Sequence, residues 1–210
     1  MKLIKSISGI RGIIGENLDT NITDFYSTIF SNIQIKGDIL LARDSRPHGN
    51  IIYKSISKTL TSLGRNVISC GIIPTPTAQY IIKEKKLAGG IVITASHNPI
   101  EWNGLKFLDT DGCFLSPDKM KDLLSKDVNP ISTNKKGSII ESEDAYQNHI
   151  QNVLSLSCLH IDKIKSKNFK IVVDTVNGAA YKILPELLEA LNCDVTKIYC
   201  DNDGNFPRGT

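Results

Sequence analysis

Short apolar runs alternate with longer segments whose apolar residues recur at helical spacing along most of this 210-residue chain. The short runs have strand length and predict buried strands at residues 38–42, 66–70, 90–95 and 104–108. The longer segments predict helices at residues 50–63 and 76–86, because their apolar positions share one helical face. Strands that alternate with helices are typical of βαβ units. We therefore predict an α/β fold with a mixed, mostly parallel sheet sandwiched by helices.

The pattern weakens once, at residues 128–142, and this break divides the chain. A helix is predicted at residues 143–157, and then a new strand, helix and strand follow at 169–174, 179–191 and 194–199. We assign residues 1–150 to a first domain and residues 151–210 to the beginning of a second α/β domain. Because so small a unit rarely buries enough surface to fold alone, we expect it to pack on the first domain or to belong to a longer protein.

Composition excludes several classes of function. The net charge is only +3 and is dispersed, which argues against a nucleic-acid partner. No run approaches the ~18 apolar residues of a membrane helix, and the first residues do not form a signal peptide. The five cysteines are odd in number and have no CxxC spacing, so free thiols in a reducing, cytoplasmic compartment are expected.

Candidate chemistry lies in the stretch TASHNP, where an apolar run ends at Thr94 and delivers Ser96, His97 and Asn98 onto a loop. In open α/β sheets, ligands bind at the carboxyl ends of strands. Asn98 precedes Pro99 and is thereby held extended, which stiffens the loop. A stiff loop suits a side chain that must be presented with little positional error.

Three interpretations of Ser96 compete. A serine at a strand end is commonly a helix cap or a turn residue. A hydrolase nucleophile with His97 as its base is disfavoured, because adjacent side chains diverge and no GxSxG elbow is present. In the third interpretation Ser96 carries a phosphoryl group, whose roughly two negative charges need nearby cations.

Four basic residues are candidates for that role. They are Arg11 in SGIRG, Arg43 and Arg46 in ARDSR, and Lys106 just beyond the loop. Arginine is the better bidentate partner for phosphate, whereas lysine is a point charge that can also lose a proton. For Arg43 and Arg46, pairing with Asp44 and other surface carboxylates is an equally well supported alternative.

The stretch TASHNPIEWNGLKF resembles the phosphoserine loop of the α-D-phosphohexomutases, which interconvert 1- and 6-phosphosugars. The resemblance covers nearly all of the chain. SGIRG, ARDSR and GIIPTPT are similar to further segments of the family's first domain, and VVDTVNGAAYKILPELLEALNCDV followed by DGNFP is similar to the start of its second domain.

The resemblance implies roles for individual residues. Ser96 would be the phosphorylated serine that gives its phosphoryl group to the sugar and takes another back. Lys106 would be the general base, although nearby anions favour its protonated form and would make it an electrostatic clamp instead. Arg11 would contact the phosphoserine region, and His97 and Asn98 would shape the loop and contact substrate.

The remaining implied contacts are to substrate and metal. Ser8, Arg43 and Arg46 would bind substrate, and the phosphate on Ser96 would give one oxygen ligand to Mg²⁺. The family's DGDxDR metal loop is not found in this sequence, and we expect the other metal ligands beyond residue 210.

We therefore expect the N-terminal part of a magnesium-dependent phosphohexomutase, acting on a hexose phosphate through a hexose bisphosphate. The missing C-terminal domains of the same chain would be its partners, and the isolated chain would have little or no activity. Glucose, mannose and glucosamine phosphates all stay open as substrates. The alternative is a catalytically incomplete module that binds a phosphosugar or another protein.

Overall fold

The computed structural model of the chain describes residues 2–125 and 135–208. Its strands are β1 (Ile4–Ser6), β2 (Gly9–Ile13), β3 (Ile39–Arg43), β4 (Val67–Ile72), β5 (Gly90–Ile93), β6 (Trp102–Leu108), β7 (Ile139–Glu141), β8 (Lys170–Asp174) and β9 (Asp194–Ile198). Its helices are α1 (Thr20–Ile33), α2 (Gly49–Ser62), α3 (Thr75–Lys85), α4 (Pro117–Ser125), the 3₁₀ turn η1 (Glu143–Ala145), α5 (Tyr146–Leu154), α6 (Ile161–Lys165) and α7 (Ile183–Ala190).

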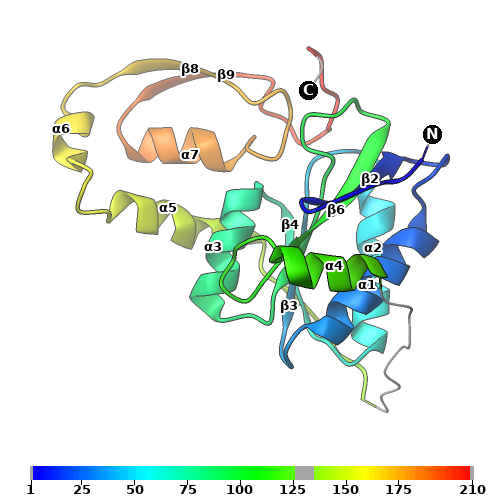
Figure 1. Ribbon diagram of the computed structural model, residues 1–210. Coiled ribbons are helices and arrows are strands. Elements are labelled where there is room, and N and C mark those ends of the chain that lie inside the picture. Colours follow the sequence, from blue (N-terminus) through cyan, green and yellow to red (C-terminus); the bar gives the residue numbers. More distant parts are fainter. Residues whose placement is uncertain (1, 126–134, 209–210) are drawn as a thin grey trace.

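The first unit is built on a seven-stranded sheet with the order β1-β2-β6-β5-β3-β4-β7. Figure 1 labels β2, β3, β4 and β6 of this sheet. A mixed α/β sheet covered by helices is confirmed. Three of the six pairings between its described strands are parallel, so the parallel share is smaller than the sequence suggested. The reason lies in residues 94–101, which turn the chain back so that β6 runs antiparallel to β5. This return is the loop that carries Ser96.

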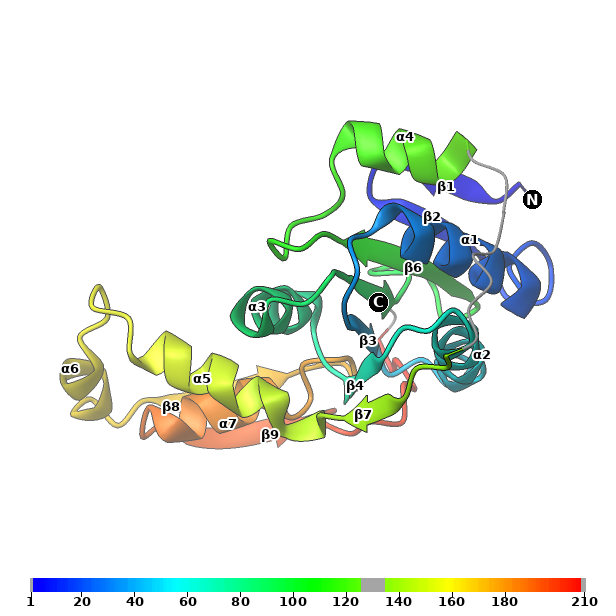
Figure 2. The ribbon, with the colours of Figure 1, turned by 90° about the horizontal axis from the view of Figure 1, so that it is seen from below.

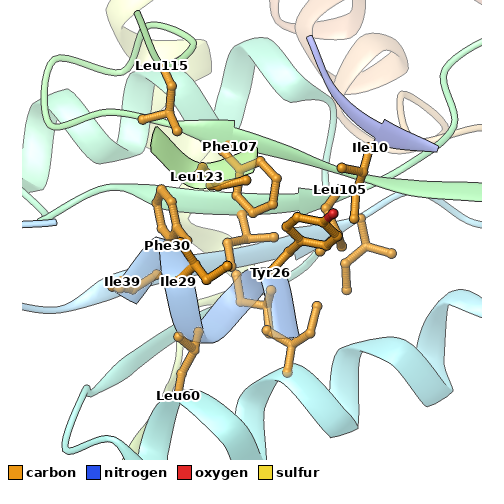
Figure 3. Close-up of a cluster of buried hydrophobic side chains, with 14 of the residues drawn as sticks. Ile10, Tyr26, Ile29, Phe30, Ile39, Leu60, Leu105, Phe107, Leu115 and Leu123 are labelled. Carbon is orange, nitrogen blue, oxygen red and sulfur yellow. The ribbon is translucent and has the colours of Figure 1, made fainter. Parts of the chain in front are cut away.

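Helices cover both faces of this sheet (Figure 2). Alternating strand residues face opposite sides, because successive side chains of a strand point in opposite directions. Leu41 faces the cluster under α1, α2 and α4, whereas its neighbour Leu40 faces the cluster under α3 and α5. In the first cluster, the rings of Phe30 and Phe107 lie 5.3 Å apart, and Figure 3 shows them among the aliphatic side chains that surround them.

Helix α1 was not predicted from the sequence, and the composition of this helix explains why. Small hydroxyl residues, Thr23, Ser27 and Ser31, are among the buried residues of this helix, which weakens its hydrophobic period. Ser27 donates through Oγ to the carbonyl of Thr23 at 2.7 Å, so its polar atom is satisfied inside the helix. Asp19 caps the helix by accepting from the amide of Ile22 at 2.8 Å.

Three other elements were also unpredicted: the β1–β2 hairpin, β7 and α6. Each strand or helix is short, and β1 and β7 are mostly exposed, so no hydrophobic period marks them. β7 pairs in parallel with β4 and lies in the stretch where the pattern weakens. Residues 128–134 of that stretch lie outside the described residues.

The second unit is the two-stranded parallel sheet of β8 and β9 with α7 packed against it. It is joined to the first unit through α5, which contacts both α3 and α7. The predicted division between residues 150 and 151 falls inside α5 and stays a prediction. None of the described helices combines the length and the apolarity of a membrane span.

Candidate active site

The loop between β5 and β6 presents Ser96 to solvent in a strained backbone conformation. Ser96 is exposed and has φ of 60°, in the left-handed region that residues with a side chain seldom adopt. Such a conformation costs about 1–3 kcal/mol and persists only where surrounding contacts impose it. The contacts are visible here. The amide of Ser96 donates to Thr94 Oγ1 at 3.0 Å, and the amide of Asn98 donates to the carbonyl of Ala95 at 3.2 Å.

Arg46 holds the same loop from inside the protein. Its side chain is fully buried, and its guanidinium donates to three main-chain carbonyls of the loop and to that of Trp102, the first residue of β6. Nη2 reaches Ser96 at 3.1 Å and Asn98 at 2.7 Å, and Nη1 reaches Pro99 at 2.6 Å and Trp102 at 3.1 Å. The five donors of an arginine are a rigid planar fork. A fork shared among four carbonyls fixes the curvature of the whole loop.

Asp44 connects this fork to the start of the loop. Its Oδ2 accepts from Arg46 Nε at 3.0 Å and from Thr94 Oγ1 at 2.7 Å, while Oδ1 accepts from the Arg46 amide at 3.1 Å. Thr94 in turn accepts from the amide of Ser96. A continuous chain of hydrogen bonds thus runs from a buried ion pair to the strained serine. Sequence reasoning missed Thr94, and only the strand end on which it lies could have indicated it.

Two cations lie together beside this loop on β2 and β6. Arg11 pairs across the ladder with Gly104, and Lys106 is two residues further along β6. A Cβ on Gly104 would lie 3.0 Å from Arg11 Cγ, so the arginine side chain lies directly across this glycine. Thr94, two residues before Ser96, donates its amide to the carbonyl of Gly104 at 2.9 Å. The two strands therefore bring Arg11 to the edge where the serine loop begins.

Lys106 is half-buried, with its Nζ 5.6 Å from the centre of the Phe114 ring. Burial lowers the pKa of Lys106 below its ordinary 10.5, the charge of Arg11 lowers this pKa further, and Asp44 opposes both effects. A lysine whose proton is held less tightly is better suited to accept and return a proton.

Ser8 lies in the β1–β2 hairpin, which packs tightly on β6. Its Oγ is 3.0 Å from Ser6 Oγ. Gly9 has φ of 120°, and a Cβ there would lie 2.1 Å from the carbonyl oxygen of Leu105 and 3.3 Å from Lys106 Cα. Only glycine permits this approach. Ser8 is thereby placed next to the strand that carries Lys106, and a substrate contact from it stays a prediction.

His97 and Asn98 lie on the loop where the sequence placed them. His97 is exposed, and its Nδ1 is 3.4 Å from Ser96 Oγ, which is long for a hydrogen bond. This geometry does not favour the histidine as the base of a hydrolase. The Asn98 carbonyl is used by Arg46, so its backbone is part of the loop's frame.

Both units of the chain match models of a known protein family. Residues 2–133 match the family model described as phosphoglucomutase/phosphomannomutase, alpha/beta/alpha domain I, and residues 144–210 match the model of alpha/beta/alpha domain II. This chain belongs to the phosphoglucomutase/phosphomannomutase family.

Individual relatives in the family are similar over nearly the whole chain. A phosphoglucosamine/phosphogalactosamine mutase of Sulfurisphaera tokodaii is 34% identical over 94% of this chain and 44% of its own length. A phosphoglucomutase/phosphomannomutase of Thermococcus kodakarensis is 32% identical over 95% of this chain and 45% of its own. The crystal structure of a phosphoglucomutase/phosphomannomutase family protein from Burkholderia thailandensis superposes with a TM-score of 0.80 at 26% identity, covering 98% of this chain and 47% of that one. The chain therefore spans about half the length of the relatives it matches.

The structure places Arg43 and Arg46, both expected to bind substrate, in different surroundings. Arg46 was expected to bind substrate, but it has no exposed surface and its donors are taken by Asp44 and the loop carbonyls. The alternative of pairing with Asp44 is the one that the structure shows. Arg43 lines cavities at β4, and a substrate contact from it stays a prediction.

Metal binding by the part of the chain that the structure describes depends on how its His, Cys, Asp and Glu side chains are grouped. Among the described residues, no group of three or more His, Cys, Asp or Glu side chains is placed to hold a metal ion. Asp44, the carboxylate connected to the loop, is already bound by Arg46 and Thr94. A phosphate on Ser96 would supply an oxygen ligand to the ion.

Proposed function

We propose that Ser96 is the phosphoryl carrier of a phosphohexomutase, and that this chain supplies the half of the active site that holds the carrier. The observation that supports the proposal most directly is the pairing of an exposed, strained Ser96 with the buried Arg46 fork that maintains it. A serine that merely capped a helix or a turn would need no such support. A carrier that must meet two different oxygens of one sugar does need it, because misplacement by about 1 Å can cost about a hundredfold in rate.

The proposed reaction has two transfers that balance each other. In the first, the bond between phosphorus and Ser96 Oγ breaks, a new bond forms to a sugar hydroxyl oxygen, and the hydroxyl proton passes to Lys106 in its neutral form. The product is a hexose bisphosphate. In the second, the other phosphate of the turned sugar returns to Ser96 Oγ, and Lys106 gives its proton back to the sugar oxygen that is released. Arg11 stabilises the charge on the transferring group.

Substrate, metal and compartment belong to the same proposal. The relatives are named for glucosamine, galactosamine, glucose and mannose phosphates, so a hexose phosphate and its bisphosphate are the substrate class. Mg²⁺ would take one oxygen from the phosphate on Ser96. The free thiols suit a cytoplasmic enzyme. The rest of the protein, matching the other half of the relatives, would supply the sugar contacts.

Mass spectrometry of the Ser96 peptide tests the carrier role. The chain is incubated with glucose 1,6-bisphosphate and Mg²⁺, and phosphate is expected on Ser96 and on no other residue. Ser96→Ala should stay unmodified, whereas Ser155→Ala, which removes an exposed serine of α5's C-terminal cap, should still be modified at Ser96. An unmodified Ser96 in a chain that nevertheless binds the sugar phosphate would favour the alternative, a module that binds without transfer.

A further inference from the structure

We propose that a cavity between the two units is a second anion site, which binds a small dianion such as inorganic phosphate or the phosphate group of a monoester. The proposal is independent of the carrier role of Ser96. It rests on the residues that line the cavity and on Arg43, which forms no salt bridge with any residue that the structure describes.

The cavity has a volume of about 220 Å³ and is lined from both units. The first unit contributes the ends of β3 and β4 and the residues before α3, and the second contributes the turn before α7 and the segment after β9. The polar side chains are those of Arg43, Tyr146, Tyr181, Lys182 and Asn202. No Asp or Glu of the described chain is among the lining residues. Such a lining donates hydrogen bonds and positive charge, which suits an anion.

Arg43 is the cavity-lining side chain with the most hydrogen-bonding capacity left for an anion. Within the described residues its guanidinium makes one hydrogen bond, from Nη1 to the carbonyl of Asp44 at 3.0 Å, and it forms no salt bridge. The carboxylate of Asp44 is directed at Arg46 and Thr94 instead. Burial lowers the pKa of Arg43, which reports the cost of holding its charge away from water. An anion in the cavity would offset that cost.

The surroundings add positive potential to the same place. Lys182 lies at the exposed mouth, 5.1 Å from the centre of the Tyr146 ring. The nearby carboxylate of Glu186, whose Oε1 accepts from the Tyr146 hydroxyl at 3.0 Å, offsets part of the Lys182 charge. Arg43 therefore supplies the larger part of the positive potential in the cavity. The N-terminal ends of α3 and α7, at Thr75 and Ile183, adjoin the cavity, and helix N-termini favour anions.

The cavity is separate from the serine loop. Ser96 follows β5, the cavity lies at the end of β4, and β3 separates these two strands in the sheet. No residue of the segment 94–106 lines it. An anion bound here would contact both units at once and would therefore strengthen their association.

Phosphate titration followed by NMR on the ¹⁵N-labelled chain tests the site. In Ser96→Ala, which removes covalent transfer, inorganic phosphate should shift the amides of Gly71, Tyr181 and Asn202. Arg43→Met should weaken this binding at least tenfold, whereas Arg11→Met, next to the serine loop, should leave it unchanged. Shifts confined to residues 94–98, or an unchanged dissociation constant in Arg43→Met, would overturn the proposal.

A second variant keeps the test decisive if Arg43→Met does not fold. Lys182 is exposed, so Lys182→Gln should fold normally and must weaken binding measurably. The ligand source is separated by comparing inorganic phosphate with a hexose 6-phosphate. Equal affinity identifies a free-phosphate site, and tighter binding of the ester identifies a phosphosugar site. Phosphate should also raise the melting temperature of Ser96→Ala, and this rise should be smaller when Lys182→Gln is added.

Discussion

Arg46 Nη2 donates to the main-chain carbonyl of Ser96 at 3.1 Å, across 50 residues of sequence. The buried guanidinium therefore acts on the exposed hydroxyl only through the backbone that carries it. This relationship separates the residue that would perform the chemistry from the residue that positions it.

Replacing Arg46 should disrupt the loop and cost stability. Arg46→Met leaves Asp44 without its partner and four carbonyls without their donor, and breaking such a buried pair costs about 3–5 kcal/mol. Arg46→Lys retains the charge but not the fork, so its loss should be smaller, and neither variant should be loaded efficiently at Ser96. Urea unfolding and Ser96 loading measure the two effects. Wild-type stability in Arg46→Met would contradict the role.

Gly104→Ala should displace Arg11. A Cβ at this position would lie 2.2 Å from the carbonyl oxygen of Ile10 and 3.0 Å from Arg11 Cγ, so β2 must move away from β6. Gly15→Ala is the matched control, because its Cβ would meet nothing within 4 Å and only its φ of 81° opposes the change. The control should cost about 1–2 kcal/mol, the usual cost of a left-handed conformation for a residue with a Cβ. In thermal unfolding, Gly104→Ala should have a clearly lower melting temperature than Gly15→Ala. Similar losses of stability in the two variants would refute the close approach of β2 and β6 at Gly104.

Lys106 should titrate below the ordinary lysine pKa of 10.5 while Ser96 is unmodified. Phosphate on Ser96 should raise this pKa, because an adjacent dianion favours the protonated form. The unfolded chain binds this proton more tightly than the folded one, so stability should rise with pH between the lowered pKa and 10.5. NMR titration of Lys106 Nζ, in wild type and in Arg11→Met, measures the pKa. Arg11→Met should raise it, and an unchanged value would show that the two cations do not interact.

Gly204→Ala should loosen the second unit from the first. Gly204 has φ of 64°, and a Cβ there would lie 2.1 Å from the carbonyl oxygen of Ser45. Beside this contact, Ser45 Oγ donates to the carbonyl of Asn177 at 2.6 Å. Hydrogen exchange should become faster in residues 175–177 and 200–206, while β5 and α1 stay protected. Ser45→Ala should give a weaker version of the same change. Uniform exchange across both units would contradict separate docking.

Local patterns predicted the strands β3, β4, β5 and β6 and the helices α2 and α3 closely. Each of these has a hydrophobic period set by burial on one or both faces. The same patterns missed α1, because its buried face uses Thr23, Ser27 and Ser31, and they overstated the parallel share of the sheet. A loop's length does not reveal whether the chain continues in the same direction or returns.

The sequence by itself determined the α/β class, the family and the position of the serine loop, because each depends on local patterns and on short contiguous motifs such as TASHNP. Only the tertiary structure decided what each arginine does. Arg43 and Arg46 are three residues apart and share one motif, yet one supports the loop and the other lines a cavity. The reason is that a side chain's role depends on which distant segments the sheet brings within its reach, and for Arg46 those partners are 50 to 56 residues away.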